Sequence, residues 1–324
     1  GSEIEQTVNE ATMKVCIIGC GAIGSLFAAH LGRLEDVEVW AYDPSKAHVD
    51  AINQNGLRLT GLSDIVVPVK ARTDAKQIPE CEFGIIAAKT LHTRPAMEAT
   101  APIFRDGAVC SVQNGIGNEE IIAEYVPRVI LGTTFPAGHV TEPGVVNHDT
   151  GGQSWISPFL PKPASMDEVN RLADALNRGG ADIVPMEDAR GALWTKLIFN
   201  SASNAMGALT RLPHGVACDQ PGVRRVMREL VNEGKAIAAA LGVTLDSDPD
   251  ALLDYGREKA YQHPPSMLTD VLNKRVTEID ALNGGIARIG KEIGIATPLN
   301  EAMTDIIKGL EYSWREDEWR NLKP

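Results

Sequence analysis

Residues 13–24 read MKVCIIGCGAIG, and this stretch decides the fold. An apolar, β-branched run ends at Ile18, a glycine-rich turn follows, and residues 22–34 have the composition of a helix. A G-x-G-x-x-G motif is weak by itself, but directly after a strand and at the start of a helix it indicates a dinucleotide-binding βαβ unit. The alternative, a merely tight turn between strand and helix, is disfavoured because all three parts agree.

Each glycine of this motif has a separate function. The first permits the tight turn, the second lets the backbone approach a pyrophosphate, and the third lets the helix pack closely on the strand. The start of the helix presents N–H groups and a positive dipole end to the phosphates. We therefore predict that the cofactor is bound by Gly19, Cys20, Gly21, Ala22, Ile23 and Gly24.

Outward from this loop, short apolar runs alternate with helical stretches. Strands that alternate with helices form βαβ units and a parallel sheet covered on both faces. The first half of the chain is therefore predicted to be an α/β domain with a Rossmann-type, doubly wound sheet. Its further strands are expected at residues 37–42, 83–88, 108–112 and 129–134, with a second helix over residues 46–53.

The pattern changes twice beyond residue 134. The β-type runs between residues 137 and 157 are broken by Pro143 and by glycines, and we expect antiparallel strands on the edge of the same sheet. After residue 187 the apolar spacing is helical, which predicts an all-helical second domain. Its helices are expected at residues 189–209, 223–241, 268–293 and 300–310. We divide the chain into a tag or disordered N-terminus (1–12), a Rossmann domain (13–187) and a helical catalytic domain (188–324).

Composition excludes several classes of partner. The 324 residues carry a formal net charge of −12, whereas nucleic acids and anionic membranes require a basic surface. No apolar run is long enough to span a bilayer, and the polar N-terminus lacks the apolar core of a signal peptide. The five cysteines are scattered without metal-ligand spacing, so we expect buried free thiols, no metal and a reducing cytoplasm.

Two side chains follow strands of the predicted sheet. Asp43 lies about 20 residues after the glycine loop, where a carboxylate accepts hydrogen bonds from ribose hydroxyls and favours NAD over NADP. It could instead cap the following helix. Lys89 follows the strand at residues 83–88, at the edge where open α/β sheets bind ligands, although a solvated surface lysine is the alternative.

A polar stripe in the second domain is the candidate substrate site. Lys196, Asn200 and Asn204 are spaced by four and share one side of an apolar helix. Burying these groups without partners is costly, and a ligand with a carboxylate and further oxygens would satisfy them. The alternative is an exposed polar stripe of an amphipathic helix.

Three other positions have simple structural interpretations when taken alone. Asn114, after the strand at residues 108–112, fits an Asn-Gly turn. Ser266 fits a helix cap, and Glu278, further along the same expected helix, fits a solvated carboxylate.

Taken together in this order, these pieces resemble the ketopantoate reductase (2-dehydropantoate 2-reductase) family from residue 13 to about residue 310. The resemblance implies a cytoplasmic oxidoreductase of pantothenate biosynthesis that reduces ketopantoate, a small 2-keto acid, with NADP or NAD. It implies that Lys196 is the general acid and that Glu278 is the second catalytic residue, which holds the substrate through its hydroxyl. The implied substrate-binding residues are Asn114, Asn200, Asn204 and Ser266, and the implied cofactor contacts include Lys89 and Asn114.

One departure from the family concerns the cofactor. Family members commonly use NADPH and often carry a basic residue where this chain has Asp43, so NAD and NADP both remain open. Two alternatives stand beside ketopantoate reduction: a dehydrogenase of the 3-hydroxyacid or 6-phosphogluconate type, and a non-catalytic redox sensor that binds a dinucleotide. The sequence shows no heptad seam and leaves a homodimer open.

Overall fold

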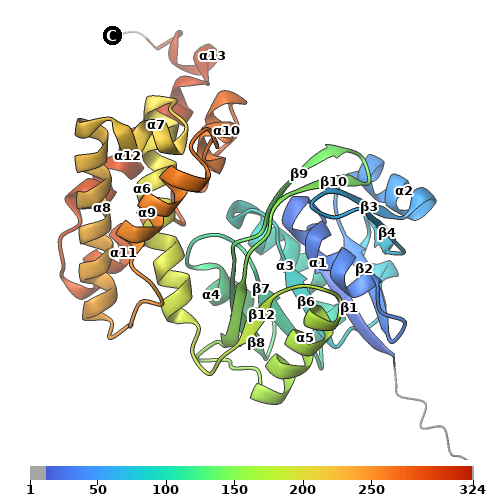
Figure 1. The fold of residues 1–324 in the computed structure, drawn as a ribbon. Coiled ribbons are helices and arrows are strands. Elements are labelled where there is room, and N and C mark those ends of the chain that lie inside the picture. Colours follow the sequence, from blue (N-terminus) through green and yellow to red (C-terminus); the bar gives the residue numbers. More distant parts are fainter. Residues whose placement is uncertain (1–11, 323–324) are drawn as a thin grey trace, which may run out of the picture. The chain divides into compact units, whose positions relative to one another are not determined.

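The computed structural model describes residues 12–322, in which strands and helices fall into two compact units (Figure 1). The first unit contains the chain up to Ala88, His92–Gln113 and Glu119–Glu187. The second contains Lys89–Leu91, Asn114–Asn118 and the chain from Asp188 onward. The interpretation of residues 1–11 as a tag lies outside the described residues.

An eight-stranded sheet forms the first unit. Its order is β12-β11-β8-β7-β6-β1-β2-β5, and every neighbouring pair is parallel except β11 and β8. From β5 to β8 this is the strand order of the Rossmann fold, with the reversal between β1 and β6. The predicted fold class is confirmed. The strands are β1 (Met13–Ile18), β2 (Val37–Tyr42), β5 (Lys70–Arg72), β6 (Phe83–Ile86), β7 (Ala108–Ser111), β8 (Val129–Thr134), β11 (Ser154–Pro158) and β12 (Ile183–Pro185).

Helices cover both faces of this sheet, and the side chains of β1 point alternately to one face and the other. Val15 and Ile17 are fully buried in one apolar cluster with residues of α1 and α5. Cys16 and Ile18 are fully buried in another, with residues of α3 and α4. The helices are α1 (Ala22–Gly32), α2 (Lys46–Asn55), α3 (Thr93–Thr100), α4 (Asn118–Ala123) and α5 (Met166–Arg178).

A second sheet corrects one prediction. The β-type runs at residues 137–150 do not lie on the edge of the main sheet but form β9 (Ala137–Glu142) and β10 (Val145–Thr150) of a separate four-stranded sheet. Its order is β4-β3-β10-β9, and β10 is parallel to β3 (Leu57–Gly61). β4 (Ile65–Val67) completes it. Only β11 joins the main sheet, and it lies inside the edge strand β12.

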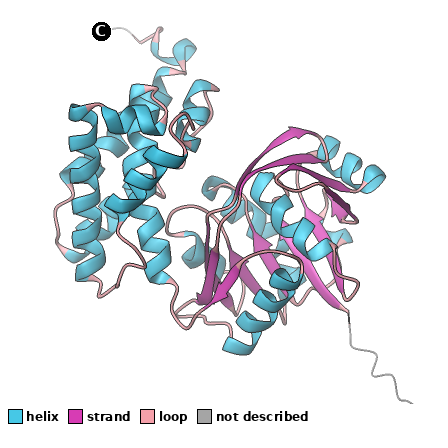
Figure 2. Cartoon of the chain, in the orientation of Figure 1, coloured by secondary structure: helices cyan, strands magenta, loops and turns pink. Residues whose placement is uncertain are grey.

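The second unit is helical: its described residues form helices and no β-strand (Figure 2). The long helices α6 and α8 pack closely, since a Cβ on Gly234 would lie 2.7 Å from a side-chain atom of Ile198. The helices are α6 (Arg190–Thr210), α7 (His214–Asp219), α8 (Pro221–Ala240), α9 (Pro249–Lys259), α10 (Ser266–Leu272), α11 (Asn283–Ile293), α12 (Pro298–Ser313) and α13 (Glu316–Trp319).

The prediction of a single helix over residues 268–293 is wrong, because two helices, α10 and α11, occupy this stretch. The chain leaves the helix after Leu272, and Lys274 adopts a left-handed conformation with φ 51°. Arg275 N–H then donates to the Asp270 carbonyl, which closes the end of α10. Glu278 therefore lies in the connection to α11 and not on the helix that begins at Ser266.

Two further features bear on the composition argument. All five cysteines are free and buried, as predicted. Among the described residues, no helix has both the length and the apolar character needed to cross a membrane.

Candidate active site

The glycine loop has the geometry that its three glycines predict. Gly19 has φ +84°, and a Cβ there would lie about 3.0 Å from the backbone of Ala88. A Cβ on Gly24 would lie 2.0 Å from the Gly19 carbonyl oxygen, so the third position admits only glycine. A Cβ on Gly21 would meet nothing within 4 Å. The backbone is thus open on the side of Gly21 and closely packed on the others.

The first turn of α1 is suited to a phosphate. Gly21 is its N-cap, no side chain caps the helix, and no acidic residue lies in the first turn. The N–H groups at a helix start and the positive dipole end attract anions. The loop and helix therefore fit the pyrophosphate of a dinucleotide.

Asp43 directly follows β2 and contacts the glycine loop. Its Oδ2 accepts from Cys20 N–H at 3.0 Å, and its Oδ1 accepts from Ser45 N–H at 2.8 Å. The alternative of a helix cap is wrong, because Ser45 is the N-cap of α2 and its hydroxyl accepts from His48 N–H. Asp43 places a carboxylate beside the loop while it also holds the loop's backbone.

The other predicted residues belong to the second unit, where Lys196 and Asn114 meet. Lys196, half-buried on α6, donates from Nζ to Asn114 Oδ1 at 2.8 Å. Burial lowers the pKa of Lys196 to about 8, and the charge of Glu278 partly opposes this shift. An amine with a pKa near neutrality is suited to donating a proton at working pH.

Asn204 and Ser266 join two helices of this unit. Asn204 Oδ1 accepts from Ser266 Oγ at 3.1 Å and from Met267 N–H at 3.0 Å. Ser266 is the first residue of α10 and not its cap, which is Pro265. Asn200 lies one turn from both Lys196 and Asn204 on α6 and is half-buried.

Glu278 binds a residue from the first half of the chain. Its Oε1 accepts from Thr90 N–H at 3.1 Å and from Thr90 Oγ1 at 3.3 Å. Thr90 Oγ1 also lies 3.4 Å from the Asn114 carbonyl oxygen. Thr90 therefore links the two residues predicted to contact substrate, Glu278 and Asn114.

Sequence reasoning missed Asp270, which binds Lys89. Lys89 Nζ lies 2.6 Å from Asp270 Oδ1, and Arg275 Nε lies 3.2 Å from the same oxygen. The Asp270 carboxylate is only 9% exposed. Its position four residues after Ser266, on the same side of a helix, was the available signal.

A buried network fixes the strand ends from which these segments leave the sheet. Gln113 Nε2 donates to the Ala88 carbonyl at 2.8 Å and to Thr93 Oγ1 at 2.7 Å, and Ser111 Oγ donates to Gln113 Oε1. Lys89 follows Ala88 and Asn114 follows Gln113 in the chain, so the network holds the starting points of both segments.

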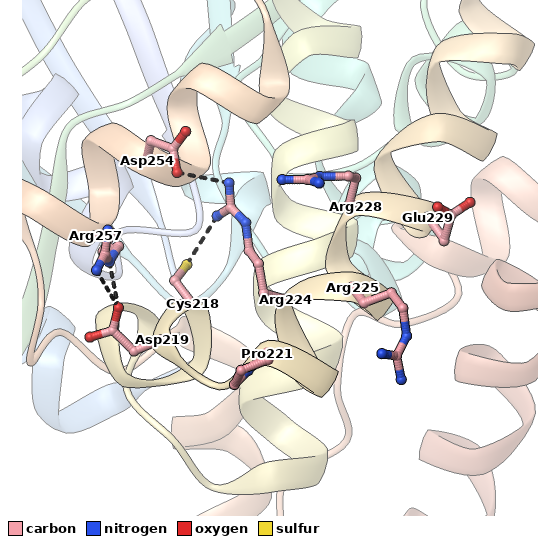
Figure 3. Close-up of a pocket in the computed structure, with 9 residues that line it drawn as sticks. All are labelled: Cys218, Asp219, Pro221, Arg224, Arg225, Arg228, Glu229, Asp254 and Arg257. Carbon is pink, nitrogen blue, oxygen red and sulfur yellow. Dashed lines mark hydrogen bonds and ion pairs between the residues drawn. The ribbon is translucent and has the colours of Figure 1, made fainter.

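The second unit also has a surface pocket of about 520 Å³ that includes none of the predicted residues (Figure 3). Arg224 pairs with Asp254 at 2.7 Å, and Arg257 pairs with Asp219 at 2.5 Å. None of the lining residues belongs to the candidate site, so the pocket does not extend it. It is lined by Cys218, Asp219, Pro221, Arg224, Arg225, Arg228, Glu229, Asp254 and Arg257.

Comparison with known proteins gives the same assignment along nearly the whole chain. The family model described as Ketopantoate reductase PanE/ApbA matches residues 15–161, and its C-terminal counterpart matches residues 188–311. The chain is similar to the 2-dehydropantoate 2-reductases of Pyrococcus horikoshii (35% identity) and Pyrococcus abyssi (33%). In both cases 92% of this chain and 98% of the relative are covered.

Solved structures agree. A PanE/ApbA family ketopantoate reductase from Ralstonia eutropha JMP134 aligns with a TM-score of 0.84 and 31% identity, covering 94% of this chain and all of that one. D-mandelate dehydrogenase in complex with NADH and anilino(oxo)acetate aligns with a TM-score of 0.83 and 25% identity, covering 93% and 99%.

Fold and site together define an oxidoreductase with a Rossmann-type domain and a helical domain. The chain belongs to the ketopantoate reductase family.

Proposed function

We propose that this protein reduces ketopantoate (2-dehydropantoate) to pantoate with NADH or NADPH. The observation that carries the proposal is the Lys196–Asn114 pair, which combines a half-buried amine of lowered pKa with a fixed amide. Family membership and the names of the relatives support the substrate.

Lys196 is the general acid of the proposed reaction. The bound dinucleotide supplies the hydride to the carbonyl carbon of the substrate. Negative charge then grows on the carbonyl oxygen, and an ammonium group within hydrogen-bond reach stabilises it and donates a proton. Asn114 Oδ1 accepts a hydrogen bond from the ammonium group and so fixes the direction of that group.

The remaining residues bind the substrate in this proposal. The half-buried Asn200 amide, one turn from Lys196 on α6, binds a carboxylate or hydroxyl of the substrate. Asn204 and Ser266 hold the adjacent helix. Glu278, held by Thr90, accepts the hydroxyl of ketopantoate. These four side chains, with Asn114, set the orientation of the carbonyl group beside Lys196.

The glycine loop, Asp43 and Lys89 are the proposed cofactor contacts. The uncapped first turn of α1 holds the pyrophosphate, and the Asp43 carboxylate accepts from ribose hydroxyls, which favours NADH. A 2′-phosphate beside Asp43 would be repelled. We therefore propose NADH as the better reductant.

The deciding experiment is a ketopantoate reduction assay with NADH and NADPH side by side. We expect turnover with both dinucleotides and a higher kcat/KM with NADH. A wild-type protein that binds a dinucleotide but reduces no 2-keto acid would contradict the proposal and favour a redox sensor.

A second candidate substrate class is supported by one observation. The chain shares its fold and 25% identity with D-mandelate dehydrogenase, whose structure contains NADH. The Asp43 carboxylate in this chain fits the use of NADH. If phenylglyoxylate or another 2-keto acid is reduced with a kcat/KM well above that of ketopantoate, the protein is a dehydrogenase of a different 2-hydroxy acid.

A further inference from the structure

The peptide of Cys20, within the glycine loop, is held by side chains at both of its polar atoms. Its N–H donates to Asp43 at 3.0 Å. Its carbonyl accepts from Ser25 Oγ at 3.0 Å and pairs with His48 Nε2 at 2.6 Å. Cys20 itself is fully buried. The conformation of the loop therefore depends on side chains from α1, α2 and the end of β2.

His48 uses both ring nitrogens, and its partners determine its tautomer. Gly144 N–H donates to Nδ1 at 2.9 Å, and Nε2 faces the Cys20 carbonyl oxygen. A backbone amide can only donate and a carbonyl can only accept. The buried imidazole is therefore neutral and carries its hydrogen on Nε2.

Gly144 brings the second sheet into this arrangement. It lies in the turn between β9 and β10, with φ +78°, and a Cβ there would lie 3.1 Å from the Ala51 Cβ on α2. Ala51 is three residues after His48, so both contacts of the turn fall on one side of α2. The β9–β10 turn thus packs directly on the helix that carries the imidazole.

We propose that His48 is a positioning residue that holds the glycine loop in its dinucleotide-binding conformation and couples the loop to the β9–β10 turn. The inference rests on the proposed dinucleotide binding and deepens it. His48 acts through the Cys20 carbonyl, next to the pyrophosphate-binding glycines that NADH and NADPH share. It therefore supports both dinucleotides equally, whereas Asp43 distinguishes between them.

Two amide variants, each of which mimics one ring nitrogen, separate the two bonds of His48. His48→Gln keeps a donor near the Nε2 position and loses the acceptor at Nδ1, whereas His48→Asn keeps an acceptor near Nδ1 and loses the donor. We expect His48→Asn to raise the Kd of NADH and of NADPH by the same factor, about 3- to 10-fold, the effect of one lost hydrogen bond. His48→Gln should bind both dinucleotides within about twofold of wild type. The Kd values are measured by fluorescence titration.

His30→Asn is the matched control, because His30 Nδ1 binds the Gly179 carbonyl in the same unit, away from the loop. It should leave both Kd values unchanged. In His48→Asn, kcat at saturating dinucleotide and the KM for ketopantoate should also stay unchanged, which a general loss of structure would not allow.

Three results would overturn the proposal. The first is that His48→Asn binds NADH and NADPH with wild-type Kd values. The second is that both His48 variants weaken dinucleotide binding equally. The third is that His48→Asn changes the ratio of the Kd for NADH to the Kd for NADPH. If His48→Asn does not fold, Ser25→Ala serves instead, because it removes the other donor to the Cys20 carbonyl. It should raise the Kd of NADH and of NADPH together. Unchanged Kd values in Ser25→Ala would also overturn the proposal. A wild-type protein that binds neither dinucleotide would instead refute the proposed function.

Discussion

Lys196 Nζ donates to Asn114 Oδ1 across 2.8 Å and 82 positions of sequence. The lysine comes from the long helix α6, and the asparagine follows β7 of the parallel sheet. The pair gives the amine a fixed direction, and burial gives it a pKa of about 8. Both properties are those of a group that donates a proton at a set position.

Removing this amine should abolish most of the reduction. Lys196→Ala is expected to lower kcat for ketopantoate by a factor of about 10² or more, as for the loss of an acid catalyst. Dinucleotide Kd should be nearly unchanged. Lys308→Ala is a suitable control, because that exposed lysine pairs with the exposed Asp280 on the surface. Unchanged turnover in Lys196→Ala would remove the residue from the mechanism.

The reduction should lose activity at alkaline pH. Lys196 must be protonated to act as an acid, and its pKa is about 8, so kcat/KM for reduction should fall as pH rises through about 8. The reverse oxidation requires the neutral amine and should rise over the same range. Rate profiles in both directions with saturating dinucleotide would check this, and parallel profiles would contradict it.

Glu278→Gln should move that profile. The Glu278 charge raises the pKa of Lys196, so removing it should shift the alkaline loss of reduction to lower pH. The amide of glutamine can still accept from Thr90, which keeps the local structure. An alkaline limb at the wild-type pH would show that the two side chains do not interact in the working enzyme.

Charge at Asp43 should control the choice of dinucleotide. Asp43→Asn keeps an oxygen acceptor for Cys20 N–H but removes the negative charge. We expect the ratio of kcat/KM for NADPH to that for NADH to rise about tenfold, the scale of one nearby like charge. Asp43→Arg should shift the ratio further, but it also removes the acceptor for Cys20 N–H and so destabilises the loop. A strong NADPH preference in the wild type would contradict the assigned role of Asp43.

A buried carboxyl predicts a pH dependence of stability. Burial raises the pKa of Glu119, 3% exposed on α4, from 4.5 to about 8. The folded protein therefore holds a proton that the unfolded chain has lost, and its stability should fall as pH rises from about 4.5 to about 8. Glu119→Gln should flatten this dependence of Tm. Glu120 is the exposed neighbour of Glu119, and Glu120→Gln should keep the wild-type pH dependence of Tm.

The cofactor loop could be predicted because its signals are local. Strand, glycine turn and helix are adjacent in sequence, and Gly24 is fixed by a contact with Gly19 only five residues away. The stripe of Lys196, Asn200 and Asn204 is equally local, and all three lie on α6. Short-range spacing was sufficient for both.

The rest depended on long-range contacts that spacing does not contain. β10 pairs with β3, some ninety positions earlier, so its sheet could not be assigned from its own alternation. Apolar residues at 276, 279 and 282 continue a helical pattern, yet Lys274 turns the chain into a left-handed conformation. The role of Asp270 became visible only through Lys89, 181 positions away.

The second unit incorporates two short pieces from the amino-terminal half, Lys89–Leu91 and Asn114–Asn118. A gene divided at residue 188 would yield a carboxy-terminal polypeptide with Lys196 but without the amide that orients its amine. Recombination between relatives meets the same constraint, because a crossover at that point combines one parent's lysine with the other parent's asparagine and threonine. Evolution of this unit is therefore tied to three separate stretches of coding sequence, which have to be inherited as a matched set.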